Sequence, residues 1–379
     1  MRLSVIAAAI LVLVASPAYA RHMPCSVAAI AAGGASVTRA RLALVAVPVP
    51  ERANGDPSDV SPRASAAIER TKDSIQAFVR LAMRCSPSRI KPGEIEAMLA
   101  AKGGATPPDA PVNEEGKQLA YQASAVPGRP NWIAVVPTMA IECGSDSMVM
   151  LFERGRQGWH EIISRRSKPY RSISEGWEGL EYAVSHPDRS GRWYLAVAST
   201  TPWCMSIWRG LRYDLSRPRA RGGKPHIFFS ENVYTHLSDT PDTLHATPGV
   251  FEIRHDGHSL EIGMSRPHVE RYAIAGDRVR RIQPVALNPR DFVDEWIVSP
   301  WAEAASWSAA DGRLKAAHAQ LAALDQKGPL GFGVIRQCAA GAHQVEVEPD
   351  KGEPWYVLVG GTGIFTVRAA SPAPSRHCR

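Results

Sequence analysis

The sequence predicts a mainly β protein made of repeated four-stranded units, arranged like the blades of a β-propeller. Two observations lead to this fold class. A pattern of Leu, Tyr, Trp and Cys residues in segment 119–152 recurs 61 residues later, in segment 180–213, without a gap. Both copies also contain short apolar runs separated by turns rich in Gly, Pro and Asp, which are typical of β-strands. Units of this size bury their sheet faces only by packing on one another; tandem β-sandwiches are the alternative to a propeller.

The start of the chain has the pattern of an export signal. Arg2 is followed by ten apolar residues, 5–14, and by an A-Y-A sequence that ends at Ala20, as in a cleavable signal peptide. Ten apolar residues are too few to cross a membrane, which takes about 20. We therefore expect residues 1–20 to be removed after Ala20, and the mature protein, without a transmembrane segment, to be periplasmic or secreted.

Residues 21–115 are predicted to combine one strand with a helical region. The strand is the apolar run 41–49, which we expect to complete the last unit and so close a ring. Apolar residues at helical spacing predict a helix over 65–85, and a Pro near its start indicates a second helix over 92–101. Segments rich in Pro, Gly, Asp or Ser predict loops at 51–63 and 103–114.

The β-repeat units 1–3 are placed in residues 116–289. Two weaker copies of the repeat extend the pattern: residues 212–213 match 271–272, with hairpin 250–264 in the place of 181–198, and segment 193–197 resembles 355–359. A Trp or Tyr that recurs at one position of a repeat is expected in the core between units. This repeat core is predicted to contain Tyr121, Trp132, Tyr182, Trp193 and Trp355.

The C-terminal part is divided into a helical insert, a last β unit and a tail. The insert spans 290–328, with helices expected over 291–301 and 309–326. The last β unit spans 329–370, and residues 371–379 are predicted to be a flexible tail.

All six cysteines follow the signal segment, and an even number in an exported protein predicts up to three disulfides. The sequence contains no C-x-x-C motif, so a redox motif or a thiolate zinc site has no support. Cys143 and Cys204 are equivalent in the repeat and are expected to lie close together and pair; two buried free thiols are the alternative. The disulfide candidates are Cys143, Cys204, Cys25, Cys85, Cys338 and Cys378.

The composition is basic, with a formal net charge of +7. The arginines are scattered rather than gathered in a long basic block, which favours a role in solubility and gives no support to nucleic-acid binding. The densest basic patch, 217–224, contains Pro and Gly and is expected to be an exposed loop.

Six of the twelve histidines lie between residues 226 and 268. Among them, His255, Asp256 and His258 offer two imidazoles and a carboxylate to a metal ion. The stronger interpretation is a hairpin turn, because Asp-Gly suits a type I′ turn and both histidines would then be exposed beside it. A weaker variant makes one histidine of this segment a general base in a propeller channel.

Three acids, Asp291, Asp294 and Glu295, share one short predicted helix near its N-terminus. We expect them to stabilise the helix dipole rather than to act in catalysis. The G-x-S-x-G motif is absent. His160-Glu161 lacks the second histidine of a zinc-protease helix, and no helix follows the glycines at 360–363 to hold a phosphate.

The absence of every strong catalytic motif predicts an exported binding or scaffolding protein of the bacterial cell envelope, without a cofactor. Its partner would be an envelope or extracellular ligand. The alternative is a periplasmic or secreted hydrolase that uses His and Asp residues of 226–268, with or without a metal ion.

Overall fold

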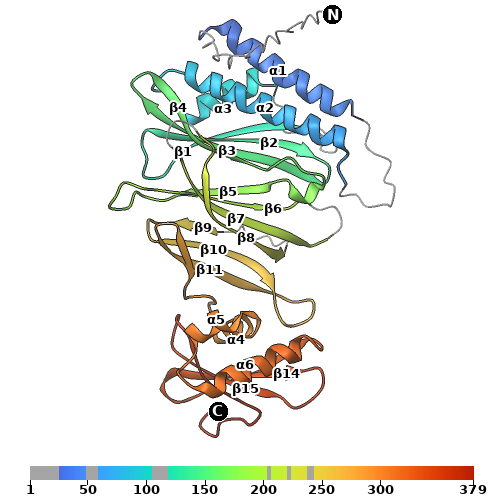
Figure 1. Ribbon diagram of the computed structural model, residues 1–379, viewed down its shortest axis with the longest axis vertical. Coiled ribbons are helices and arrows are strands. Elements are labelled where there is room, and N and C mark those ends of the chain that lie inside the picture. Colours follow the sequence, from blue (N-terminus) through green and yellow to red (C-terminus); the bar gives the residue numbers. More distant parts are fainter. Residues whose placement is uncertain (1–24, 48–58, 105–117, 203–205, 220–222, 237–242) are drawn as a thin grey trace, which may run out of the picture.

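The chain folds into a stack of helical and sheet layers (Figure 1). The computed structural model describes residues 25–47, 59–104, 118–202, 206–219, 223–236 and 243–379, so the predicted signal segment lies outside it. These described residues form a helical layer, three four-stranded sheets, a second helical layer and a fourth four-stranded sheet. The predicted mainly β architecture of repeated four-stranded units is therefore confirmed.

The elements have the following bounds. The helices are α1 (Val27–Val45), α2 (Pro62–Cys85), α3 (Pro92–Lys102), α4 (Pro289–Val298), α5 (Trp301–Ala304) and α6 (Gly312–Asp325). The first sheet contains β1 (Leu119–Ala125), β2 (Trp132–Ile141), β3 (Gly144–Gly155) and β4 (Gly158–Arg166). The second sheet contains β5 (Glu178–Val184), β6 (Leu195–Thr200), β7 (Trp208–Arg217) and β8 (His226–His236). The third sheet contains β9 (Thr243–Ala246), β10 (Val250–His258), β11 (Ser265–Ala275) and β12 (Arg278–Arg281). The fourth sheet contains β13 (Leu330–Gln337), β14 (Ala342–Pro349), β15 (Trp355–Gly360) and β16 (Thr366–Ser371).

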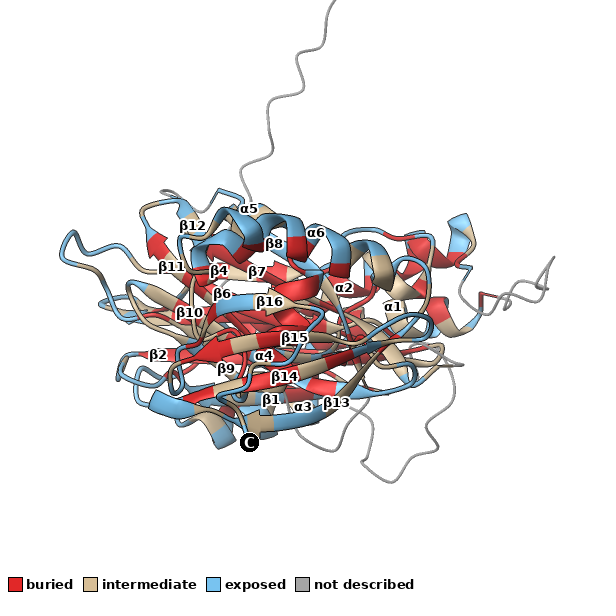
Figure 2. Cartoon of the chain, turned by 90° about the horizontal axis from the view of Figure 1, so that it is seen from below, coloured by how far each residue is buried: buried red, intermediate tan, exposed pale blue. Residues whose placement is uncertain are grey.

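Every sheet is an antiparallel meander in which each strand pairs with the next one along the chain. Apolar side chains fill the spaces between neighbouring layers except between the third sheet and the second helical layer, where buried charges meet. Figure 2 shows buried residues along the strands. Val135 lies in the core between the N-terminal helices and the first sheet, and Val149 in the core between the first and second sheets. Tyr213 lies between the second and third sheets, and Trp296 between the second helical layer and the fourth sheet.

The stack is open, and the predicted closure of a ring is wrong. The first and last sheets lie towards opposite ends of the molecule (Figure 1). Residues 41–45 of the strand predicted at 41–49 are the last turn of α1 instead. The reason is local: this segment continues an Ala-rich run with high helix propensity, and the Ser26 side chain caps it by accepting a hydrogen bond from the Ala29 amide.

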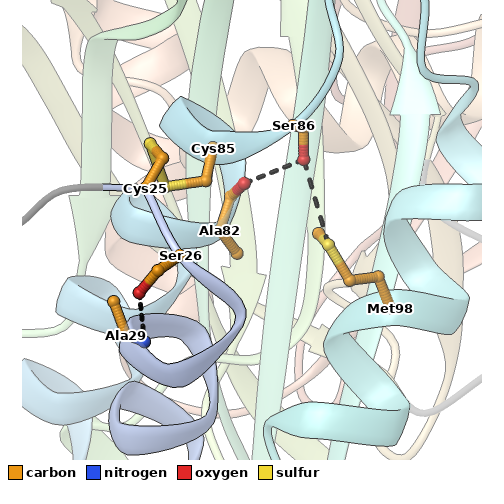
Figure 3. Close-up of a disulfide and its surroundings, with 7 residues drawn as sticks. All are labelled: Cys25, Ser26, Ala29, Ala82, Cys85, Ser86 and Met98. Carbon is orange, nitrogen blue, oxygen red and sulfur yellow. Dashed lines mark hydrogen bonds between the residues drawn. A yellow bond between two sulfur atoms is a disulfide. The ribbon is translucent and has the colours of Figure 1, made fainter.

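The N-terminal helical layer is fastened by a disulfide between Cys25 and Cys85, with Cα atoms 5.2 Å apart (Figure 3). This bond joins the start of α1 to the end of α2, so the two helices run antiparallel. Gly34 lets α1 approach α3 closely, because a Cβ there would collide with the carbonyl oxygen of Lys102. The helices predicted over 65–85 and 92–101 correspond to α2 and α3.

Within the described part of the chain, α1 is the one helix long and apolar enough to cross a membrane. It lies near the N-terminus and packs on α2 and α3, and signal sequences and core helices of soluble proteins share its length and composition. A second disulfide, Cys338–Cys378, ties the last sheet to the C-terminus. Disulfides indicate an oxidising, extracytoplasmic compartment.

The duplication is visible in the first two sheets, with a shift that the sequence alignment does not show. Tyr121 and Tyr182 both lie on the first strand of their sheet and face the preceding layer. The pairing of the first two strands differs by one residue between the sheets. In the first sheet Ser124 pairs with Ala134, and their equivalents at the 61-residue offset are Ser185 and Leu195. In the second sheet, however, Leu195 pairs with Val184. A slip of one residue turns side chains to the opposite face.

This shift brings the two repeated tryptophans together. Trp132 faces the second sheet and Trp193 faces the first, so that their rings meet edge to face with centroids 4.7 Å apart. The guanidinium of Arg129 lies 4.5 Å from the Trp132 ring and 5.9 Å from the Trp193 ring. Trp355, by contrast, begins the third strand of its sheet, so the alignment of 193–197 with 355–359 joins non-equivalent strands.

Two C-terminal predictions also change. The tail 371–379 is not free: Gln337 and Arg379 exchange two backbone hydrogen bonds beside the Cys338–Cys378 bond. Residues 250–264 do not form a hairpin around Asp256-Gly257, because β10 continues to His258 and the turn follows it.

Candidate functional site

The metal-ligand set predicted from adjacent residues does not converge. Side chains alternate along β10, so His255 is buried whereas Asp256 is half-buried on the other face. His258 is exposed and stacks on Trp208, with ring centroids 3.4 Å apart. The expectation that His255 is an exposed residue beside a turn is also wrong, since its side chain is 2% exposed.

Strand pairing gathers a different set, which we call the histidine cluster: His255, His268 and Glu270. His255 and His268 are directly opposite on β10 and β11, and Glu270 follows on the same face of β11. One potential ligand atom from each residue lies within 4.8 Å of the others. The two rings are nearly parallel, with centroids 5.1 Å apart.

Buried charges from α4 and β12 surround this cluster. Glu295 pairs with Arg281 at 2.8 Å, with Arg266 at 2.7 Å and with His268 at 3.2 Å. Burial alone would raise the pKa of the Glu295 carboxyl, but Arg281, the hydrogen bond with His268 and Arg266 outweigh it and hold that pKa well below its usual range. Glu270 accepts a hydrogen bond from Tyr272 and pairs with Arg281.

The three acids of the predicted helix have two different roles. Asp291 lies in the first turn of α4, where its charge favours the helix dipole as expected. Asp294 and Glu295 instead face the third sheet: Asp294 accepts hydrogen bonds from Ser259 Oγ at 2.7 Å and from the Leu260 amide at 3.0 Å. α4 is thus attached to the third sheet by charges.

A cavity of about 500 Å³ opens beside the histidine cluster, between β8, β11, β12 and the segment after α4. Glu270, Tyr272 and Arg281 line it together with Glu231 and Glu303. This cavity gives Glu270 a route to the solvent.

A larger cavity of about 960 Å³ lies between α2, the first sheet and the second sheet. Three of its lining side chains, Lys168, Arg212 and Lys224, form no salt bridge within the described residues. We call it the cation pocket. Trp177 and Ile227 contribute apolar wall.

Asp214 and Arg165 form a buried ion pair in the wall of the cation pocket, with Nη2 and Oδ2 2.7 Å apart. The other carboxylate oxygen, Oδ1, is buried and has no hydrogen-bond partner in the described structure. Burial raises the pKa of Asp214 to about 6, against the opposing effects of Arg165, Arg212 and Lys168. A carboxyl with a raised pKa in a pocket wall is a recognised mark of functional sites.

A Ser–Lys contact also borders this pocket. Lys72 Nζ lies 2.9 Å from Ser167 Oγ, as in enzymes that use lysine as a base. The same ammonium pairs with Glu69 and with Asp146, and Ser167 is within hydrogen-bond distance of Asp146. These contacts engage both Lys72 and Ser167, and they hold α2 on the first sheet.

The remaining predicted residues are placed as follows. Cys143 is disulfide-bonded, and its predicted partner Cys204 lies outside the described residues, so that pairing stays a prediction. Sequence reasoning missed Arg165 and Asp214. The one available signal was the alternation of charged Arg212 and Asp214 with apolar Leu211, Tyr213 and Leu215 along the strand.

Comparison with models of known protein families finds no match for this chain, and comparison with curated proteins finds no similar sequence.

Proposed function

We propose that this chain is an exported binding protein of the bacterial cell envelope that holds an anionic ligand in the cation pocket. The observation that carries the proposal is the presence of Lys168, Arg212 and Lys224, three cations without salt-bridge partners in the described structure, around a cavity of about 960 Å³. Anionic groups bind to such a wall by charge-assisted hydrogen bonds. The planar guanidinium of Arg212 suits a carboxylate or a phosphate.

The proposed location is the periplasm or the extracellular space. The disulfides support an oxidising compartment, and the sequence at the N-terminus has the pattern of a signal peptide cleaved after Ala20. Mass spectrometry of the protein purified from a periplasmic extract tests the cleavage, which predicts a mature chain that begins at Arg21.

Calorimetric titration of the full mature chain tests the binding function. Citrate, inorganic pyrophosphate and a galacturonate oligosaccharide serve as carboxylate, phosphate and acidic-glycan probes. We expect at least one to bind, with an affinity that falls as salt is added and decreases at least tenfold in a Lys168→Ala/Arg212→Ala variant.

The matched control is Arg278→Ala/Lys327→Ala, which removes one Arg and one Lys that are exposed and do not line the pocket. This variant should bind as the wild type does. If none of the three probes binds the wild type, or if the control loses as much affinity, the proposal is wrong.

A second candidate is a hydrolase that uses residues of the 226–268 segment. The observation that favours it is the buried His255 beside the Glu270 cavity. A panel of ester, phosphoester and peptide substrates tests it: activity that disappears in His255→Gln would support this candidate, and activity independent of His255 would remove it.

A further inference from the structure

We infer that the histidine cluster, His255, His268 and Glu270, is a binding site for a divalent transition-metal ion of the zinc class. This site lies between β10 and β11, apart from the cation pocket, and does not depend on the anion-binding function.

The first argument is the state of His255. Its side chain is 2% exposed, and neither ring nitrogen has a hydrogen-bond partner in the described structure. A buried polar group without a partner costs roughly 1–3 kcal/mol. Its Nε2 faces Glu270 Oε1 across 3.9 Å, which is too long for a hydrogen bond. Two ligands that share a zinc ion, each about 2 Å from it, lie roughly 3 to 4 Å apart.

The second argument is the orientation of His268. Its Nε2 lies 3.0 Å from the backbone oxygen of His258, an acceptor that requires this nitrogen to carry a proton. Metal-binding histidines usually donate their second ring nitrogen to a carbonyl or carboxylate in this way. Nδ1 faces Glu295 Oε2 at 3.2 Å, so it is the nitrogen left for a metal ion, in exchange for its contact with Glu295.

The third argument is the charge of the surroundings. Three buried carboxylates, Glu270, Asp294 and Glu295, face two buried guanidiniums, Arg266 and Arg281. Buried Asp291 adds a further carboxylate near Arg266, so the carboxylates outnumber the guanidiniums and favour a bound cation. Glu295 keeps its contacts with Arg266, Arg281 and Ser299 when His268 turns to the metal.

The local backbone leaves room for both rings. Gly257 lies beside them, and a Cβ at this position would come within 2.6 Å of His268 Cδ2 and 3.2 Å of His255 Cε1. The glycine that suggested a turn in the sequence therefore makes space for two imidazoles inside a strand. Two nitrogen ligands and one carboxylate favour zinc, cobalt or nickel over calcium and magnesium, which prefer oxygen ligands.

Metal titration of the full mature chain tests this inference. The protein is produced without a polyhistidine tag, stripped with a chelator, dialysed and titrated with Zn²⁺ by calorimetry and with Co²⁺ by absorbance. We expect one ion per chain. His255→Gln and Glu270→Gln each remove a proposed ligand and should weaken binding at least tenfold, because even the loss of a group that only supports a ligand costs roughly 10- to 100-fold.

The matched control is His245→Gln, which changes an exposed histidine on the neighbouring strand β9 and should leave affinity unchanged. X-ray absorption at the zinc edge of the wild-type complex gives a readout that needs no variant: imidazole and oxygen ligands are expected. Failure of the wild type to bind either ion, sulfur ligands at the zinc, or full affinity in both cluster variants would each overturn the inference.

Discussion

Asp214 shows at the scale of one residue how burial and charge compete. Its pKa in the folded protein, about 6, lies above the value of about 3.9 in an unfolded chain. The folded state therefore holds this proton more tightly. The stabilisation is fully present below pH 4 and is lost as the pH rises through 6. Two pKa units correspond to about 3 kcal/mol.

We therefore predict a pH-dependent difference between the wild type and Asp214→Asn. The free energy of unfolding of the wild type, minus that of the variant, should fall by about 2 kcal/mol between pH 4 and pH 7. Urea denaturation at four pH values measures it. Asp350→Asn, at the far end of the stack, is the control, and a difference that stays constant with pH would contradict the assignment.

At the scale of elements, the contact between α1 and α3 depends on Gly34. An Ala at this position gains helix propensity, but its Cβ would collide with the Lys102 carbonyl. We predict that Gly34→Ala lowers the free energy of unfolding by about 1–3 kcal/mol, the usual cost of overpacking. Gly93→Ala is the matched control, because Gly93 is also helical and has open space around its Cα.

Chemical denaturation of the two variants gives the comparison. Gly93→Ala should be neutral or slightly stabilising, since it meets no neighbour and favours the helix. Equal effects of the two substitutions would mean that α1 and α3 are not held at the distance the structure shows.

The elements also show what the sequence could and could not predict. Periodicity and turn residues were sufficient for α2, for α3 and for the four-stranded units, because these signals are local. The apolar run 41–49 fits a buried strand as well as a helix, so apolar pattern alone predicts the wrong element there. The Ala-rich segment before it carried the opposing signal.

The candidate site required information that a single sequence does not contain. His255 meets His268 only through the register of β10 and β11, and adjacent residues such as Asp256 point elsewhere. The shift between Trp132 and Trp193 has the same origin: identical residue types align at one offset, whereas their faces depend on a register that differs by one residue.

At the scale of the molecule, α4 connects the two halves of the stack, because it contacts β11 of the third sheet and β14 and β15 of the fourth. Glu295 on this helix neutralises two buried guanidiniums. Removal of one partner from a buried ion pair costs about 3–5 kcal/mol. We predict a loss of this size for Glu295→Ala in denaturation experiments, with faster hydrogen exchange in α4.

Glu353→Ala is the control, since this carboxylate is exposed in the connection between β14 and β15 and its loss should change stability by less than about 0.5 kcal/mol. A small effect of Glu295→Ala would mean that apolar packing alone holds α4 between the sheets.

An unclosed row of sheets has a weakness that a ring lacks, since its two terminal layers have a neighbour on one side only. Fraying in such linear assemblies begins at the outermost members and moves inward. The two disulfides with both cysteines described, Cys25–Cys85 and Cys338–Cys378, fall in those two terminal layers. These disulfides therefore stabilise the two terminal layers. In a reducing environment we expect unfolding to begin in those layers while the middle sheets stay folded.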